Sequence, residues 1–143
     1  MDYWTYPAEA ENGRTLLLTG RDGLDKYRLS GKYNFRVIAS WDYNALPDGM
    51  PCDEDALLME QATDAFEAAT TKDKAAVLTG IYTGDGRRDW VFYTKSLHLF
   101  QALFNRALLP LDPMPLVIEA AEDPAWEEYL EMKANSYVPP EKN

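Results

Sequence analysis

The sequence predicts an α+β fold of the ferredoxin-like type, in which a split βαβ antiparallel sheet carries two helices on one face. The prediction rests on a period-two strand, an amphipathic helix that follows it, and a hairpin further along the chain. From residue 33 the expected order is strand, helix, strand, strand, helix, strand, helix. The first six elements match the split βαβ pattern, and an N-terminal strand and a C-terminal helix are additions to it.

The clearest strand is Tyr33–Tyr43, because its apolar and polar residues alternate. One face carries Phe35, Val37, Ala39, Trp41 and Tyr43. The strand ends at Pro47-Asp48-Gly49, where proline presets φ and glycine permits a positive φ.

Two helices are predicted from apolar residues that recur every three or four positions. The first runs from Asp53 to about Thr70, with Glu54 and Asp55 near its positive N-terminal end. The second lies within Ser96–Leu109, where Ser96 can cap its start and Pro110 ends it.

The stretch "LTGIYTGDGRRDWVFYT", residues 78–94, reads as a hairpin with Asp85-Gly86 as its two-residue turn. A phosphate loop would lead from a strand into a helix, whereas Arg87-Arg88 leads into another strand. An anion site there would be a minor addition. The expected cross-strand pairs are Thr83–Arg88, Tyr82–Asp89, Ile81–Trp90, Gly80–Val91, Thr79–Phe92 and Leu78–Tyr93.

The remaining elements are shorter. Arg14–Arg21 and Pro115–Ala121 are predicted strands, Trp4 to Tyr6 a short extended piece, and Asp25–Ser30 a single helical turn. A last helix is expected at 123–134, with Asp123 as its N-cap and Pro124 in its first turn. Both faces of the hairpin are apolar, so we expect the N-terminal strand and the Trp126 helix, or a partner protein, to cover the second face.

Length and composition fit one domain at 1–138, with a core at 33–121 and a frayed tail at 139–143. The 143 residues carry a formal charge of −10, which disfavours binding to nucleic acid. No apolar run is long enough for a membrane span, and no signal peptide opens the chain, so we expect a cytoplasmic protein that does not bind membranes.

No catalytic set, metal site or cofactor site is predicted. His98 and Cys52 are each the single residue of their kind, and neither has a partner nearby in the sequence. The carboxylates along the first long helix read as a solvated acidic face, because no Glu-x-x-His pattern accompanies them.

The aromatic residues offer two interpretations. Together with Arg36 or Arg88 they can form a binding patch, or they can fill the core of a small domain. Core packing is the favoured interpretation for the set, and Arg88 and Trp90 are the residues expected to be exposed at the hairpin end. The predicted partner-binding residues are Arg88, Trp90, Trp41 and Tyr82.

Three stretches, "GMPCDEDALLMEQATDAFEA", "AAVLTGIYTGDGRRDWVFYT" and "EDPAWEEYLEM", resemble the bacterial family catalogued as domain of unknown function 695. The resemblance covers Trp4 to Met132. No activity is assigned to this family, so the resemblance does not indicate what the protein does. A more remote likeness, in element order and acidic character, is to the regulator of ribonuclease E activity, type B. That likeness implies a ferredoxin-like domain that acts by binding an enzyme.

The biochemical function is therefore unknown at the level of sequence. The favoured hypothesis is a non-enzymatic, cytoplasmic module that binds a protein partner or a second copy of itself. The alternative is a small-molecule-binding protein or enzyme with an aromatic-lined pocket between the sheet and the C-terminal helix.

Overall fold

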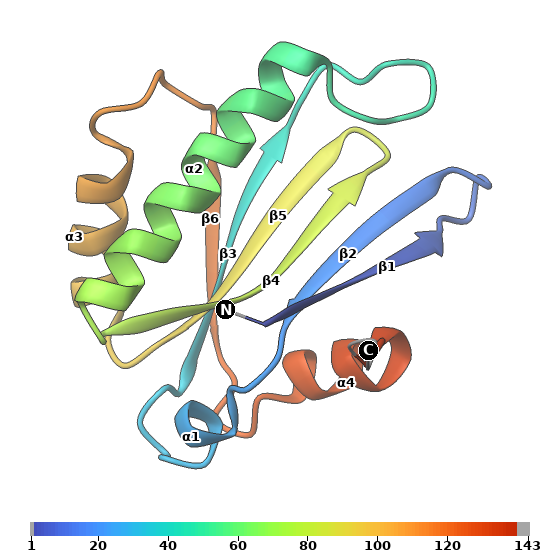
Figure 1. Ribbon diagram of the computed structural model, residues 1–143. Coiled ribbons are helices and arrows are strands. Elements are labelled where there is room, and N and C mark those ends of the chain that lie inside the picture. Colours follow the sequence, from blue (N-terminus) through green and yellow to red (C-terminus); the bar gives the residue numbers. More distant parts are fainter. Residues whose placement is uncertain (1, 140–143) are drawn as a thin grey trace.

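The computed structural model describes residues 2–139, and its centre is a six-stranded antiparallel sheet (Figure 1). The strand order is β1-β2-β4-β5-β3-β6. The strands are β1 (Tyr3–Glu9), β2 (Thr15–Arg21), β3 (Phe35–Asp42), β4 (Ala76–Gly84), β5 (Arg87–Thr94) and β6 (Val117–Glu122). Most of the tail predicted at 139–143 lies outside the described residues.

Within the described part of the chain, four helices accompany the sheet: α1 (Asp25–Arg28), α2 (Asp53–Lys72), α3 (Leu97–Leu108) and α4 (Glu127–Ser136). Ser96 caps α3 as predicted, because its side chain accepts a hydrogen bond from the Leu99 amide. α2 carries three acidic residues in its first turn and ends two residues beyond the predicted Thr70.

The alternation predicted for β3 is confirmed, and it directs one face of the sheet toward α2 and α3. Phe66 of α2 lies 5.2 Å from the Phe92 ring of β5 and 5.1 Å from the Phe104 ring of α3. The buried residues of this first core layer are Val37, Ala39, Trp41, Tyr43, Met59, Ala62, Phe66, Ala76, Leu78, Ile81, Trp90, Phe92, Phe100 and Phe104.

A second core layer lies on the opposite face, and α4 covers it. This confirms the prediction that the Trp126 helix covers the second apolar face of the hairpin. Trp126 stacks on Tyr93 with ring centroids 4.2 Å apart, and its indole N–H donates to the Tyr33 carbonyl. The layer consists of Trp4, Leu24, Tyr33, Val77, Val91, Tyr93, Trp126, Tyr129 and Met132. The expectation that the N-terminal strand also covers this face is wrong, because β2 pairs with β4 and so extends the sheet sideways.

The predicted hairpin turn is confirmed, since Asp85 and Gly86 have φ values of 51° and 83°. The four pairs nearest the turn also match the prediction. Beyond Gly80 the register shifts, so Leu78 pairs with Phe92 rather than with Tyr93. This β-bulge at Thr79 lets Leu78 and Ile81, three residues apart, both face the first core layer.

The prediction that the last helix begins at Asp123 is wrong. α4 begins at Glu127, after Trp126 adopts a left-handed conformation with a φ of 57°. Asp123 still serves the helix start, because its carboxylate accepts hydrogen bonds from the amides of Glu127 and Glu128. The left-handed residue separates this cap from the helix and buries the Trp126 ring against the sheet.

Asp123 also ties α4 to the sheet, and this gives the fold a pH dependence. The carboxylate accepts from the Tyr93 hydroxyl at 2.7 Å. Burial alone would raise the pKa of Asp123, but the Tyr93 hydroxyl and the two amides lower it below its ordinary value. A lowered folded pKa stabilises the protein above the unfolded pKa of about 3.9, and the stabilisation is lost as the pH falls through the folded value.

Asp123→Asn should therefore lower the free energy of unfolding at neutral pH by about 1–3 kcal/mol, because the amide accepts these bonds less well. The deficit should shrink below about pH 4, where the wild-type carboxylate is protonated. Urea unfolding at several pH values measures both effects. Asp112→Asn, at an exposed position, is the control. An equal loss at every pH would show that the charge is unimportant.

Trp90 is a second critical position, because its side chain is fully buried in the first core layer. Its indole N–H donates to the Thr63 hydroxyl at 2.9 Å. Trp90→Ala should lower the free energy of unfolding by about 3–5 kcal/mol. Tyr6→Ala, at a 38% exposed position, should cost less than about 1 kcal/mol in the same denaturant titration. Similar losses for both variants would contradict this assignment of Trp90 to the core.

Candidate functional site

The structure places two of the four predicted partner-binding residues in the core. Trp41 is 6% exposed and Trp90 is fully buried, so neither side chain presents a surface to a partner. The expectation that Trp90 is exposed is wrong, because its side of β5 faces α2. Sequence periodicity gives the face of a strand but not which helix covers it.

Arg88 lies beside both tryptophans. It pairs with Trp41 across the β3–β5 ladder, and its guanidinium carbon lies 5.3 Å from the centre of the Trp90 ring. Burial lowers the pKa of Arg88 to about 10. Three of the four predicted residues are thus brought together, around a half-buried cation rather than on an exposed patch.

Tyr82 lies on the opposite face of the sheet, next to α4. Its hydroxyl donates a hydrogen bond of 3.1 Å to Glu128. Burial raises the pKa of the Tyr82 hydroxyl and that of the Glu128 carboxyl. Tyr82 is half-buried and therefore belongs to the attachment of α4 rather than to the group around Arg88.

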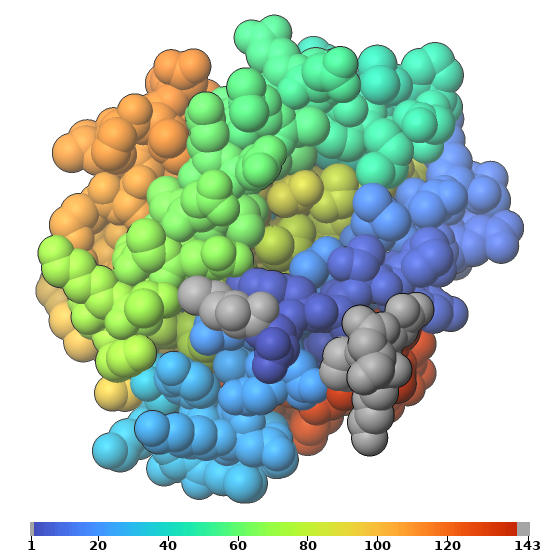
Figure 2. Space-filling view, viewed as in Figure 1, coloured from blue at the N-terminus to red at the C-terminus, as the bar shows by residue number. Residues whose placement is uncertain are grey.

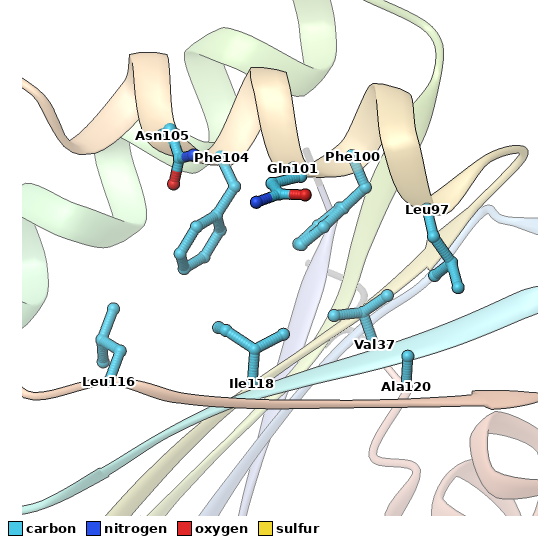
Figure 3. A pocket seen from close by; sticks show the side chains of 9 residues that line it. All are labelled: Val37, Leu97, Phe100, Gln101, Phe104, Asn105, Leu116, Ile118 and Ala120. Carbon is cyan, nitrogen blue, oxygen red and sulfur yellow. The ribbon is translucent and has the colours of Figure 1, made fainter.

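An apolar groove lies between α3 and β6 (Figure 3). It has a volume of about 420 Å³, and the rings of Phe100 and Phe104 point from α3 toward Ile118 and Ala120. Gln101 and Asn105 supply polar groups on the helix side. The lining residues are Val37, Leu97, Phe100, Gln101, Phe104, Asn105, Leu116, Ile118 and Ala120.

β6 forms one wall of this groove and is also an edge of the sheet. Among the described residues it pairs only with β3, and all six of its residues are exposed, including Val117 at 59% and Ile118 at 45%. Its outer side therefore presents backbone N–H and C=O groups without a strand partner. The opposite edge, β1, contains Pro7, which lacks an N–H and so obstructs further pairing.

The charges along β6 are negative. Glu119 lies opposite Ile38 in the ladder, on the face away from the groove, whereas Ile118 and Ala120 face the groove. Glu122 ends the strand. A chain that pairs with β6 would therefore meet Ile118 and Ala120 on the groove face and Glu119, between Val117 and Ala121, on the other. Glu122, opposite Phe35, lies at the end of the groove face.

Sequence reasoning predicted this strand but gave it no role. The order of strands in a sheet is set by long-range pairing, so 115–121 could not be recognised as an edge. The available signal was the run of small and apolar residues "VIEAA", which contains no proline or lysine to protect an edge.

The candidate catalytic residues do not gather into a site. His98 is exposed on α3, and Cys52 occupies the N-cap position of α2 without a side-chain capping hydrogen bond. Among residues 2–139, no three His, Cys, Asp or Glu side chains cluster in a way that could hold a metal ion. Within the same residues, no helix has the length and apolar character needed to cross a membrane.

Comparison with known proteins gives one match. It is to a family described as a family of unknown function, DUF695, over residues 3–132. No curated protein and no solved structure matches the chain, so the likeness to the regulator of ribonuclease E activity remains an expectation. The matched range includes all six strands and most of α4, and the chain therefore belongs to the DUF695 family.

Proposed function

We propose that this protein is a non-enzymatic, cytoplasmic interaction module that binds an extended segment of another protein along β6. In this proposal the bound segment adds a strand to the sheet, with alternate side chains apolar and basic. The observation that carries the proposal is an edge strand exposed at every residue beside an apolar groove.

The backbone of β6 supports strand addition. In this mode of recognition, main-chain hydrogen bonds supply affinity, and pockets for alternate side chains supply specificity. β6 has six residues, close to the usual length of a strand, and β3 holds it in place from Phe35 to Ser40. A bound strand would satisfy the outward backbone groups that water satisfies in the free protein.

The groove favours apolar side chains on the face of the bound segment that lies against it. Phe100 and Phe104 are 3% and 6% exposed, so they form a floor that is packed into the first core layer. Leu97, at 41% exposed, stands at the groove margin. Apolar side chains from a partner strand would cover this surface and remove it from water.

The charges favour a basic partner over a second copy of the chain. Two copies would each bring a formal charge of −10, and each β6 would bring Glu119 and Glu122 to the shared edge. Lysine or arginine side chains on the outer face of a partner strand would instead pair with Glu119.

We also propose that residues 35–122 form a ferredoxin-like core with α2 and α3 on one face. The strand order β4-β5-β3-β6, with α2 between β3 and β4 and α3 between β5 and β6, supports this description. The buried residues of both helices also share the first core layer. β1, β2 and α4 are then additions to that core.

The enzyme alternative has less support. It requires an aromatic-lined pocket between the sheet and α4, but the rings of that layer pack on one another. Trp126 stacks on Tyr93, and Tyr129 lies edge-on to Trp126 with ring centroids 5.5 Å apart.

Selection from a displayed library of random peptides tests the proposal. The library should contain peptides of about ten residues, longer than a typical strand. Selected peptides should alternate apolar with basic residues. Ile118→Asp, which puts a charge into the groove, should weaken their binding by about tenfold or more in a fluorescence titration.

Leu57→Asp is the matched control, because Leu57 is also exposed but lies on α2. It should leave peptide binding unchanged. Selected peptides without alternation, or with equal affinity for both variants, would contradict the proposal. A dimer seen in sedimentation that Ile118→Asp dissociates would show that a second copy occupies the edge instead.

A further inference from the structure

A second hollow lies on the helix side of the sheet, between α2 and strands β2, β4 and β5. In Figure 2 the atoms of β4 and β5 are visible at its bottom, between α2 and the N-terminal strands. Its volume is about 360 Å³, within the range of small-ligand pockets. The sheet contributes Leu17, Thr19, Ile81, Thr83 and Arg88.

The hollow exists because α2 does not extend over the N-terminal strands. β2 lengthens the sheet beyond β4, and its side chains Leu17 and Thr19 stand on the α2 side, opposite Thr83 and Ile81. α2 contributes the other wall through Ala56, Glu60, Thr63 and Asp64. This hollow is separate from the groove beside β6.

Arg88 lines this hollow, and its N–H groups have no hydrogen-bond acceptor within the described residues. Within residues 2–139 its guanidinium donates no hydrogen bond and forms no ion pair, and its Nε atom is buried without a partner. The guanidinium carbon lies 5.3 Å from the centre of the Trp90 ring, and this cation–π contact provides no hydrogen-bond acceptor for the N–H groups. The in-plane N–H groups still require an acceptor, and a planar carboxylate matches their geometry.

Two carboxylates stand on the α2 wall of the same hollow. Glu60 and Asp64 are four residues apart, so they lie on the same side of the helix. Both are exposed, and in the described part of the chain neither forms an ion pair with Arg88 or with any other cation. The hollow thus presents a cation on the sheet and anions on the helix.

We propose that this hollow binds a small zwitterion, namely an apolar α-amino acid or a short apolar peptide. Its carboxylate pairs with the in-plane N–H groups of Arg88, and its ammonium group lies toward Glu60 and Asp64. Its side chain packs on Leu17, Ile81 and Met50. A bare phosphate or dicarboxylate fits less well, because Glu60, Asp64 and the net charge of −10 repel a second negative charge.

The energetic reason is the desolvation of Arg88. A guanidinium withdrawn from water without an acceptor loses hydration that nothing in the protein replaces. A carboxylate ligand restores those hydrogen bonds in surroundings where charges attract one another more strongly than in water. Burial is also the reason why the pKa of Arg88 is lowered, and the group is still protonated at neutral pH.

Isothermal titration of the full chain with four probes tests the proposal. The probes are L-leucine, the dipeptide Leu-Leu, isoamylamine (leucine without its carboxylate) and 4-methylpentanoate (leucine without its ammonium). L-leucine or Leu-Leu should bind with a Kd between about 1 μM and 1 mM. Whichever of the two binds more tightly shows whether the ligand is a free amino acid or a short peptide. Both single-charge analogues should bind about tenfold more weakly, or worse.

Substitutions test which residues pair with the carboxylate and with the ammonium group of the ligand. Arg88→Met should abolish the preference for L-leucine over isoamylamine, whereas Arg106→Met, at an exposed position on α3, should leave it unchanged. Glu60→Gln combined with Asp64→Asn should abolish the preference over 4-methylpentanoate. Both acidic side chains are exposed, so this double variant tests the hollow even if Arg88→Met unfolds.

Two results would overturn the inference. One is that neither L-leucine nor Leu-Leu binds the wild-type protein more tightly than about 1 mM. The other is that binding is seen but is indifferent to the Glu60 and Asp64 substitutions and to removal of the ligand carboxylate. Neither result bears on peptide binding at β6, because the two sites share no residue.

Discussion

The fold depends on one constraint: the β4–β5 hairpin is apolar on both of its faces. Trp90 and Phe92 project to one side, and Val91 and Tyr93 project to the other. A sheet of this kind cannot leave either face in water, so it needs a layer on each side. α2 and α3 provide the first layer and α4 the second. The bulge at Thr79 adjusts the pleat so that both layers receive apolar side chains.

The same constraint bears on where the two proposed binding surfaces lie. The helices pack on the middle strands of the sheet, and the two surfaces lie toward its outer strands. At one side β6 is an edge strand, and an apolar groove lies between it and α3. At the other side β2 extends the sheet beyond β4, and a hollow with both apolar and charged lining residues, Arg88 among them, lies between it and α2.

The two surfaces differ in what they can recognise. The β6 edge offers repeated backbone groups, which suit an extended chain and give little discrimination between small molecules. The hollow offers one desolvated cation and two carboxylates at fixed places, which suit a compact ligand with separated charges. Arg88 therefore acts at a small-molecule site in our account, although the sequence assigned it to a protein interface with Trp41 and Trp90.

The sequence by itself determined the local elements, because they follow from short-range periodicity and turn chemistry. It fixed the β3 alternation, the Asp85-Gly86 turn, the Ser96 cap and the need to cover both faces of the hairpin. Three features depend on long-range packing: β6 is an edge, Trp90 is buried beside Arg88, and Trp126 is left-handed before α4 begins. Strand order, helix cover and Trp126 packing depend on contacts between residues far apart in the chain, which no local pattern encodes.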